Sequence, residues 1–286
     1  MRKLVLFLSL GLLSLNAFAQ NDGTGGVTLE PRDGFYDKIH GNNRRVVPYP
    51  HMRESDVTEA WRVWREIDFR EKVNQVFYYP LTPTNGRKNY IEILRTGILT
   101  DLIVTPFNSE NDDFKVQLTT SDFAKIGTRR DTQWVPSPDP PYEPVQKIID
   151  EPFKPDAVKA VRLKEDWFFD RQRSVMECRI IGMLPMMQQF NASTGDFEGM
   201  VGMAWIYFPQ ARHVMSREEV YNTKNYAQRI TFDDLFMKRM FSSRILKVDN
   251  VHDRYIADYT TGLDALLVGE EIKEQIFLFE HDMWEQ

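Results

Sequence analysis

Residues 161–184, VRLKEDWFFDRQRSVMECRIIGML, hold two runs in which apolar and polar side chains alternate, separated by the polar residues DRQR. A period of two is typical of a half-buried antiparallel strand, and the polar break favours a turn. The apolar positions that share a face are Val161, Leu163, Trp167 and Phe169 in the first run and Met176, Cys178 and Ile180 in the second. The stretch therefore predicts a β-hairpin in the second half of the chain.

Cys178, the only cysteine of the chain, lies in this hairpin. A reactive thiol needs a lowered pKa, which a helix N-terminus, a nearby cation or an adjacent base can provide. Its neighbours Glu177 and Arg179 belong to the other face of the strand. We interpret Cys178 as a buried side chain of the sheet core rather than a nucleophile. A single cysteine also excludes an intramolecular disulfide.

The segment 55–72, SDVTEAWRVWREIDFREK, shows helical spacing of its large apolar residues, and Ser55 suits an N-cap. The residues on the apolar stripe are Val57, Trp61, Trp64 and Ile67. We expect a buried helix here, with both tryptophans in the core rather than in a ligand-stacking site.

The remaining segments complete a mixed pattern. Aromatic residues 75–81 predict a short strand, and residues 103–118 and the turn at Asp249-Asn250 each predict a hairpin. A further strand is expected over residues 199–209. Helices are expected over residues 90–102, over 231–241 with Thr231 as N-cap, and over 263–279. The expected fold class is α+β, with antiparallel sheets and flanking helices.

Residues 91–120 align without a gap on residues 232–261. The identical pairs are Leu94 with Leu235, Asp112 with Asp253, Thr119 with Thr260 and Thr120 with Thr261. The alignment predicts that a helix–hairpin–helix module occurs twice. The alternative, that any two units of this kind resemble each other, stays open.

Two stretches lack apolar periodicity, residues 20–51 and residues 131–156, and the second contains seven prolines. Because proline removes a backbone donor and fixes φ, this stretch is excluded from a helix interior or a central strand. The expected organisation is a signal peptide over residues 1–19, an extended arm over 20–51, a first α+β module over 52–130, a Pro-rich linker over 131–156 and a second α+β module over 157–286.

Both stretches carry isolated aromatic residues, which disordered linkers usually lack. These residues are Phe35, Tyr36, Tyr49, Trp134, Tyr142 and Phe153. We expect them to contact a partner chain. The alternative, that the arm and the linker fold back on their own chain, stays open.

The N-terminus has the pattern of a secretory signal peptide, with Arg2 and Lys3, an apolar run over residues 4–15 and the motif Ala17-Phe18-Ala19. The run is too short for a permanent membrane anchor. Its removal would change the formal charge from −6 to −8, by loss of Arg2 and Lys3. An acidic chain is a poor candidate for nucleic acid, whose binding depends on Lys and Arg. We expect an exported protein without an anchor of its own.

No catalytic or metal-binding pattern emerges from the sequence. The histidines form neither an HExxH pair nor a Cys/His cluster, and no GxSxG, SxxK, phosphate-loop or dinucleotide motif occurs. His281 stands between Glu280 and Asp282, and we interpret it as part of the polar end of a helix. We expect no catalytic residue, no metal and no cofactor.

Four segments resemble signature segments of the gliding-motility family GldN, called PorN in non-gliding relatives. They are residues 62–81 (RVWREIDFREKVNQVFYYPL), 165–185 (EDWFFDRQRSVMECRIIGMLP), 231–245 (TFDDLFMKRMFSSRI) and 279–285 (FEHDMWE). The resemblance runs from about Asp56 to Glu285. Some members of the family carry a C-terminal extension that does not follow Gln286 here.

The resemblance implies a periplasmic component of the type IX secretion system of Bacteroidetes. Members of the family form rings beneath the outer membrane with the lipoprotein GldK/PorK, and a GldL–GldM (PorM-like) motor is thought to reach these rings. The family has no known catalytic residues, so none is carried over. Two other classes stay open: a periplasmic hydrolase or metal-dependent enzyme, and a monomeric binding protein with one deep apolar pocket.

Overall fold

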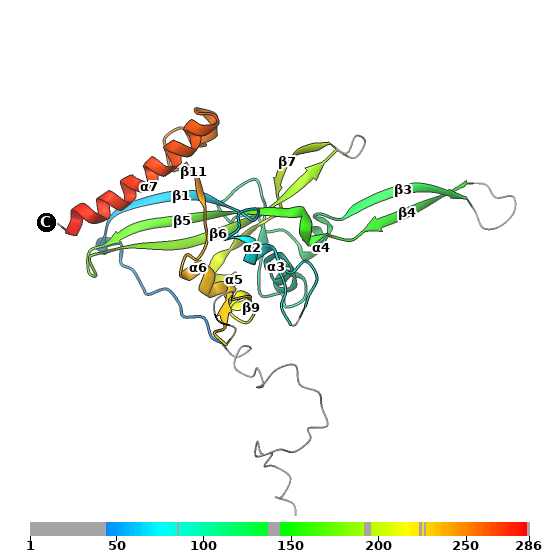
Figure 1. Ribbon diagram of the computed structural model, residues 1–286, viewed down its shortest axis with the longest axis horizontal. Helices are drawn as coiled ribbons and strands as arrows, with labels where there is room; N and C mark the ends of the chain where they lie inside the picture. The colour runs from blue at the N-terminus through cyan, green and yellow to red at the C-terminus, as the bar shows by residue number, and fades with distance from the viewer. Residues whose placement is uncertain are drawn as a thin grey trace, which may run out of the picture. The chain divides into compact units, whose positions relative to one another are not determined.

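The computed structural model describes residues 44–84, 86–136, 144–191, 196–222, 225 and 227–284, all within the compact unit His40–Gln286. The fold is α+β, as predicted (Figure 1). The main sheet is antiparallel in the order β11-β1-β5-β6-β8-β2, and β7 pairs with β6. Its strands are β1 (Val57–Asp68), β2 (Pro106–Phe107), β5 (Val158–Asp170), β6 (Val175–Phe190), β7 (Phe197–Gly202), β8 (Trp205–Tyr207) and β11 (Arg244–Val248).

Helices and two small sheets surround this sheet. The α-helices are α2 (Gln75–Tyr78), α3 (Tyr90–Leu99), α4 (Thr120–Lys125), α5 (Phe208–Met215), α6 (Phe232–Met237) and α7 (Leu263–Trp284). The small sheets are β3 (Arg129–Pro136) with β4 (Pro144–Glu151) and β9 (Glu219–Val220) with β10 (Ile230–Thr231), and the 3-10 turns are η2 (Glu54–Asp56), η3 (Pro155–Ala157) and η4 (Ile256–Asp258).

The predicted hairpin of residues 161–184 is confirmed as β5 and β6, which are joined by the turn 171–174. Asp170 stabilises this turn, because its carboxylate accepts a hydrogen bond from Gln172 N at 2.9 Å and pairs with Arg173 at 2.6 Å. Cys178 lies opposite Trp167 in the register, so both share one face of the sheet, as the alternation predicts.

The helix predicted over residues 55–72 is wrong: this segment is β1, paired with β5 on one side and β11 on the other. Its second half, residues 63–67, is buried on both faces of the sheet. A strand buried on both faces lacks the alternation that marks a half-buried strand, and its large residues then mimic a helical stripe. Trp61 and Trp64 consequently lie on opposite faces.

Two more local predictions are corrected. Residues 75–78, expected as a strand, form the short helix α2, whose Phe77 packs among the rings of Phe69 and Tyr90. The turn after β11 leads into η4 rather than into a second strand. The helices predicted near residues 90–102, 231–241 and 263–279 are confirmed as α3, α6 and α7.

The cap of α6 is also confirmed. Thr231 Oγ1 accepts a hydrogen bond from Asp234 N at 3.3 Å, and Asp234 Oδ2 accepts one from Thr231 N at 3.1 Å. This reciprocal pairing satisfies two donors at the helix start. The strand expected over residues 199–209 is split into β7 and β8, and the hairpin expected over residues 103–118 is reduced to β2 with a bridge from Phe107 to Gln117.

The main hydrophobic core lies between one face of the sheet and helices α2, α3, α5 and α6 (Figure 1). From the sheet it takes Ile67, Val161, Leu163 and Met183, all fully buried. Strands on both sides of residues 131–156 therefore contribute to one sheet and one core. Within that stretch, where the sequence predicts an extended linker, β3 and β4 form a hairpin with Pro136 opposite Pro144 at the end of its ladder.

Helix α7 lies along the edge strand β11 (Figure 1). Gly269 permits a close approach, because a Cβ there would lie 3.2 Å from Ile245 O. The inward residues of α7 include Ile276, which packs with Val63 and Ile245, and Phe279, whose ring lies 4.9 Å from that of Trp61. Among the helices that the structure describes, none is long and apolar enough to cross a membrane.

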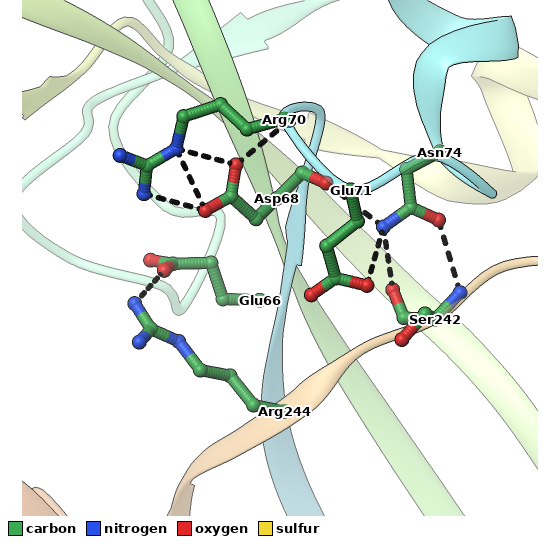
Figure 2. A network of polar contacts seen from close by, with 7 residues as sticks. All are labelled: Glu66, Asp68, Arg70, Glu71, Asn74, Ser242 and Arg244. Carbon is green, nitrogen blue, oxygen red and sulfur yellow. Dashed lines mark hydrogen bonds and ion pairs between the residues drawn. The ribbon is translucent and has the colours of Figure 1, made fainter.

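Polar contacts join the end of β1 to the chain before β11 (Figure 2). Asn74 is fully buried, and its side chain donates to Asp68 O and Ser242 O, each at 2.9 Å, and accepts from Ser242 N at 2.9 Å. Glu66 pairs with Arg244 across the two strands. These contacts replace water for buried polar groups and thereby fix β11 beside β1.

The proposed internal repeat stays a prediction. Both aligned segments begin with a helix, α3 or α6, and continue into an edge strand of the sheet, β2 or β11. Leu94 and Leu235, one of the identical pairs, are both buried in the main core.

Candidate functional site

A cavity of about 570 Å³ lies between α7 and the sheet. Its lining combines charged and apolar side chains: Arg65, Trp167, Arg239, Glu270, Lys273, Glu274, Ile276, Phe277 and Glu280. The floor comes from β1, β5 and the loop after α6, and the rim comes from α7.

Glu165 forms the centre of the charged floor. Alternation along β5 places it on the same face as Leu163 and Trp167, and it is fully buried. Its carboxylate accepts hydrogen bonds from Arg239 Nη1 at 2.9 Å, Arg239 Nη2 at 3.2 Å and Trp167 Nε1 at 3.1 Å. Arg239 thus binds the carboxylate with two nitrogens, which is the strongest geometry for this pair.

Arg65 is the second cation at this carboxylate, and it is only 5% exposed. Its Nε lies 3.2 Å from Glu165 Oε2 without hydrogen-bond geometry, and this nitrogen donates no hydrogen bond to any residue that the structure describes. Burial lowers the pKa of Arg65 below its ordinary value. Two guanidinium groups therefore share one buried carboxylate.

Trp167 lies between these two cations. The guanidinium carbon of Arg65 is 5.5 Å from the centre of its ring, and that of Arg239 is 5.0 Å away. Cations over an indole face gain electrostatic stabilisation. The ring also forms part of the cavity wall.

Cys178 belongs to this charged cluster, which corrects the expectation of an apolar core position. Its Sγ lies 3.6 Å from Glu165 Oε2 and 3.2 Å from Arg239 Nη1. Burial, together with the charge of Glu165, raises the pKa of the thiol above its ordinary value. The thiolate is disfavoured at neutral pH, which agrees with the expectation that Cys178 is no nucleophile.

Helix α7 exposes large apolar residues. They are Leu263, Leu266, Leu267, Phe277, Leu278 and Met283, of which Leu263 is 69% and Phe277 63% exposed. The turn before the helix adds Val251, Tyr255 and Tyr259. An exposed apolar patch of this kind marks a candidate surface for contact with another protein.

A second cation–tryptophan cluster lies on the opposite face of the sheet. Trp64 on β1 stands directly between Lys164 of β5 and Lys247 of β11 in the strand register. The Nζ atoms lie 5.8 Å and 4.3 Å from the ring centre. Lys164 pairs with Asp112 at 3.2 Å and Lys247 pairs with Asp253. These two aspartates are an identical pair of the proposed repeat.

Of the six predicted partner contacts, Tyr49 packs on its own chain. Its ring lies 5.3 Å from the guanidinium of Arg179 and 5.0 Å from that of Arg212, and its hydroxyl is 3.6 Å from Met237 Sδ. Burial raises the pKa of Tyr49 to about 12. The neighbouring Arg44 pairs with Asp234 at 2.6 Å.

Phe153 also packs on its own chain, with the guanidinium of Arg95 4.1 Å from its ring centre. Gly127, at φ +76°, leaves room for this ring, because a Cβ there would lie 2.6 Å from it. Trp134 lies on β3 opposite Gln146. Phe35, Tyr36 and Tyr142 lie outside the described residues. As contacts with a partner, all six stay a prediction.

Sequence reasoning did not find the cavity, although one signal was present. In each strand, the residues two positions before and two positions after Arg65 or Glu165 are apolar, so the charged side chain is on the same face as apolar ones. Charged residues at such positions are almost never buried without a partner. Across the described part of the chain, no group of three His, Cys, Asp or Glu residues is placed to hold a metal ion.

Residues 52–285 match the family described as "Gliding motility associated protein GldN". No curated protein matches the chain.

Proposed function

Because the chain belongs to the GldN family of gliding motility associated proteins, we propose that it is a non-enzymatic structural subunit of the type IX secretion and gliding apparatus. The family match over residues 52–285 is the observation that carries this proposal. The subunit would be exported by the signal peptide of residues 1–19 and would form a periplasmic ring with a GldK/PorK-like outer-membrane lipoprotein. A GldM/PorM-like motor protein is the second expected partner.

The outer surface of α7 supports a role in assembly. Leu267 and Leu278 are exposed there at 58% and 48%, and the helix is held to the sheet by its other side. A subunit of a ring must offer two different surfaces to its neighbours. The apolar surface of α7 is suited to be one of them.

Co-purification with the lipoprotein, followed by negative-stain imaging, tests the assembly. We expect the wild-type chain to elute with the lipoprotein and to form rings. Leu267→Glu should prevent this while the melting temperature stays unchanged, because the side chain is exposed. Gln275→Glu, on an exposed position of the same helix, is the control with the same added charge. A chain that stays monomeric beside the lipoprotein would contradict the proposal.

The arm and the Pro-rich region supply further proposed contacts, through the aromatic residues named above. Removal of residues 20–43 should weaken co-purification and leave thermal unfolding unchanged. Arg44 and Tyr49 are kept in this variant because both contact their own chain. Full assembly of the shortened chain would remove the arm from the proposal.

The cavity beside α7 favours the second candidate function, that of a monomeric binding protein, because it offers about 570 Å³ with aromatic and charged walls. The two candidates differ in native mass. A binding protein would stay monomeric with and without the lipoprotein, whereas a ring subunit would not.

A further inference from the structure

The cavity floor carries more positive than negative charge. Arg65 and Arg239 both approach Glu165, which is the one carboxylate they share. Glu165 accepts two hydrogen bonds from Arg239 and one from Trp167, but none from Arg65 Nε. Arg65 Nε is left without a hydrogen-bond acceptor among the described residues, although it lies 3.2 Å from this carboxylate.

A buried guanidinium nitrogen without an acceptor is costly, since this donor has lost water and gained no hydrogen bond in return. Arg65 is 5% exposed and forms part of the cavity wall, so the space next to it is open to a ligand. A carboxylate is the group that best matches the planar fork of an arginine.

The other walls define what should accompany the carboxylate. Trp167 lies beside Arg65, and Phe277 of α7, 63% exposed, faces the same cavity. These rings would cover an apolar or aromatic group. The rim carries Glu270, Glu274 and Glu280 and one lysine, Lys273, which lies 3.1 Å from Glu270. Glu270 also acts electrostatically on Arg65.

We propose that this cavity is a binding pocket for a carboxylate joined to an apolar group, with Arg65 holding the carboxylate and Trp167 and Phe277 holding the apolar part. The pocket goes beyond the proposed assembly function, which requires no ligand. Either a small organic acid or an acidic residue of a protein chain has this chemistry.

The test uses N-acetylphenylalanine as probe and N-acetylphenylalanine amide as its neutral match. Binding to the full chain is followed by calorimetry and by the NMR signal of the Trp167 indole N–H, identified with Trp167→Phe. We expect the acid to bind with a dissociation constant on the order of 1 mM and at least about tenfold more tightly than the amide.

Arg65→Met should abolish the preference for the acid, so that acid and amide bind alike. Arg62→Met is the matched control, because Arg62 is on the same strand but on the opposite face, where it pairs with Asp166 at 2.7 Å. Circular dichroism and thermal melting verify that each variant is folded. Should Arg65→Met not fold, Phe277→Ala serves instead, because its side chain is 63% exposed and we expect the variant to fold; it should weaken acid and amide about equally.

Glu270→Gln removes a negative charge from the rim and should strengthen binding of the acid several-fold without changing that of the amide. A blocked peptide, acetyl-Phe-Asp amide, distinguishes the two sources. Tighter binding of this peptide points to an acidic residue within a protein chain, and tighter binding of N-acetylphenylalanine points to a small acid or a chain end. The proposal is overturned if neither probe binds at 20-fold the expected constant, if acid and amide bind the wild type equally, or if folded Arg65→Met keeps the preference.

Discussion

The two faces of the sheet carry two clusters built from the same parts, a tryptophan between two cations. On one face, Trp64 stands between Lys164 and Lys247, and each lysine has its own aspartate. On the other, Trp167 stands between Arg65 and Arg239, and both arginines share Glu165.

The difference between the clusters is one carboxylate. At Trp64 the positive and negative charges are equal in number, and Asp112 also accepts a hydrogen bond from the indole N–H at 2.7 Å. At Trp167 two arginines share one buried carboxylate, and the cavity next to them is rimmed by Glu270, Glu274 and Glu280. Buried ion pairs contribute little net stability, but an unmatched buried charge costs much. The balanced cluster is therefore structural, and the unbalanced one is the candidate for binding.

The largest effect is expected for Glu165→Gln. It leaves the buried Arg65 and the partly buried Arg239 without their shared counter-charge and should lower the free energy of unfolding by about 3–5 kcal/mol. Urea denaturation measures this loss. Asp253→Asn is the control from the balanced cluster, where the aspartate side chain is 80% exposed, and it should cost less than about 1 kcal/mol. Equal losses for the two variants would remove the distinction between the clusters.

Lys164→Met comes next. Lys164 Nζ donates to Asp112 O at 2.8 Å, and the side chain is 8% exposed. Its loss leaves Asp112 without its cation and should cost about 1–2 kcal/mol in the same urea measurement. A variant as stable as the parent would show that the balanced cluster does not stabilise the sheet.

A smaller effect concerns pH. Burial raises the pKa of Tyr49 to about 12, above that of an unfolded tyrosine, so the folded state holds this proton more tightly. The corresponding stability is fully present below about pH 10 and is lost as the pH rises through 12. Since Tyr49 is only partly buried, we expect the wild type to lose on the order of 1 kcal/mol relative to Tyr49→Phe over this interval. Parallel pH profiles of the two proteins would contradict the packing of Tyr49 on its own chain.

The smallest effect is expected for Arg65→Met, which removes the surplus cation and leaves Glu165 with Arg239 and Trp167. Its free energy of unfolding should stay within about 1 kcal/mol of the parent or rise. Lys164 has an aspartate of its own, whereas Arg65 shares its carboxylate with Arg239. The free energies of unfolding of the two variants therefore compare the loss of a paired cation with the loss of a shared one. A loss above that of Lys164→Met would mean that Arg65 is needed for the fold itself.

The β5–β6 hairpin could be predicted because one side of each strand is polar, so alternation survives in the sequence. Strand β1 could not, because burial on both faces removes the alternation and Arg65 and Glu66 look like solvent-exposed charges until their partners are known. The capped helix α6 was predictable from local chemistry at Thr231.

The candidate site was beyond local reasoning for the same reason. Arg65, Glu165 and Arg239 come together only through the pairing of β1 with β5 and the packing of the loop after α6. Sequence spacing carries no information on such long-range pairing. The prediction that Cys178 lies in a strand is confirmed, whereas its charged neighbours come from distant segments and could not be anticipated.

The close approach of α7 to β11 at Gly269 has a consequence for solubility. β11 is the outermost strand on its side of the sheet, and exposed edge strands invite pairing with other chains and aggregation. By lying against this edge, α7 shields it from further strands. If the helix moved away from β11, a strand of another chain could pair with this edge. The helix therefore hinders polymerisation of the protein through its sheet.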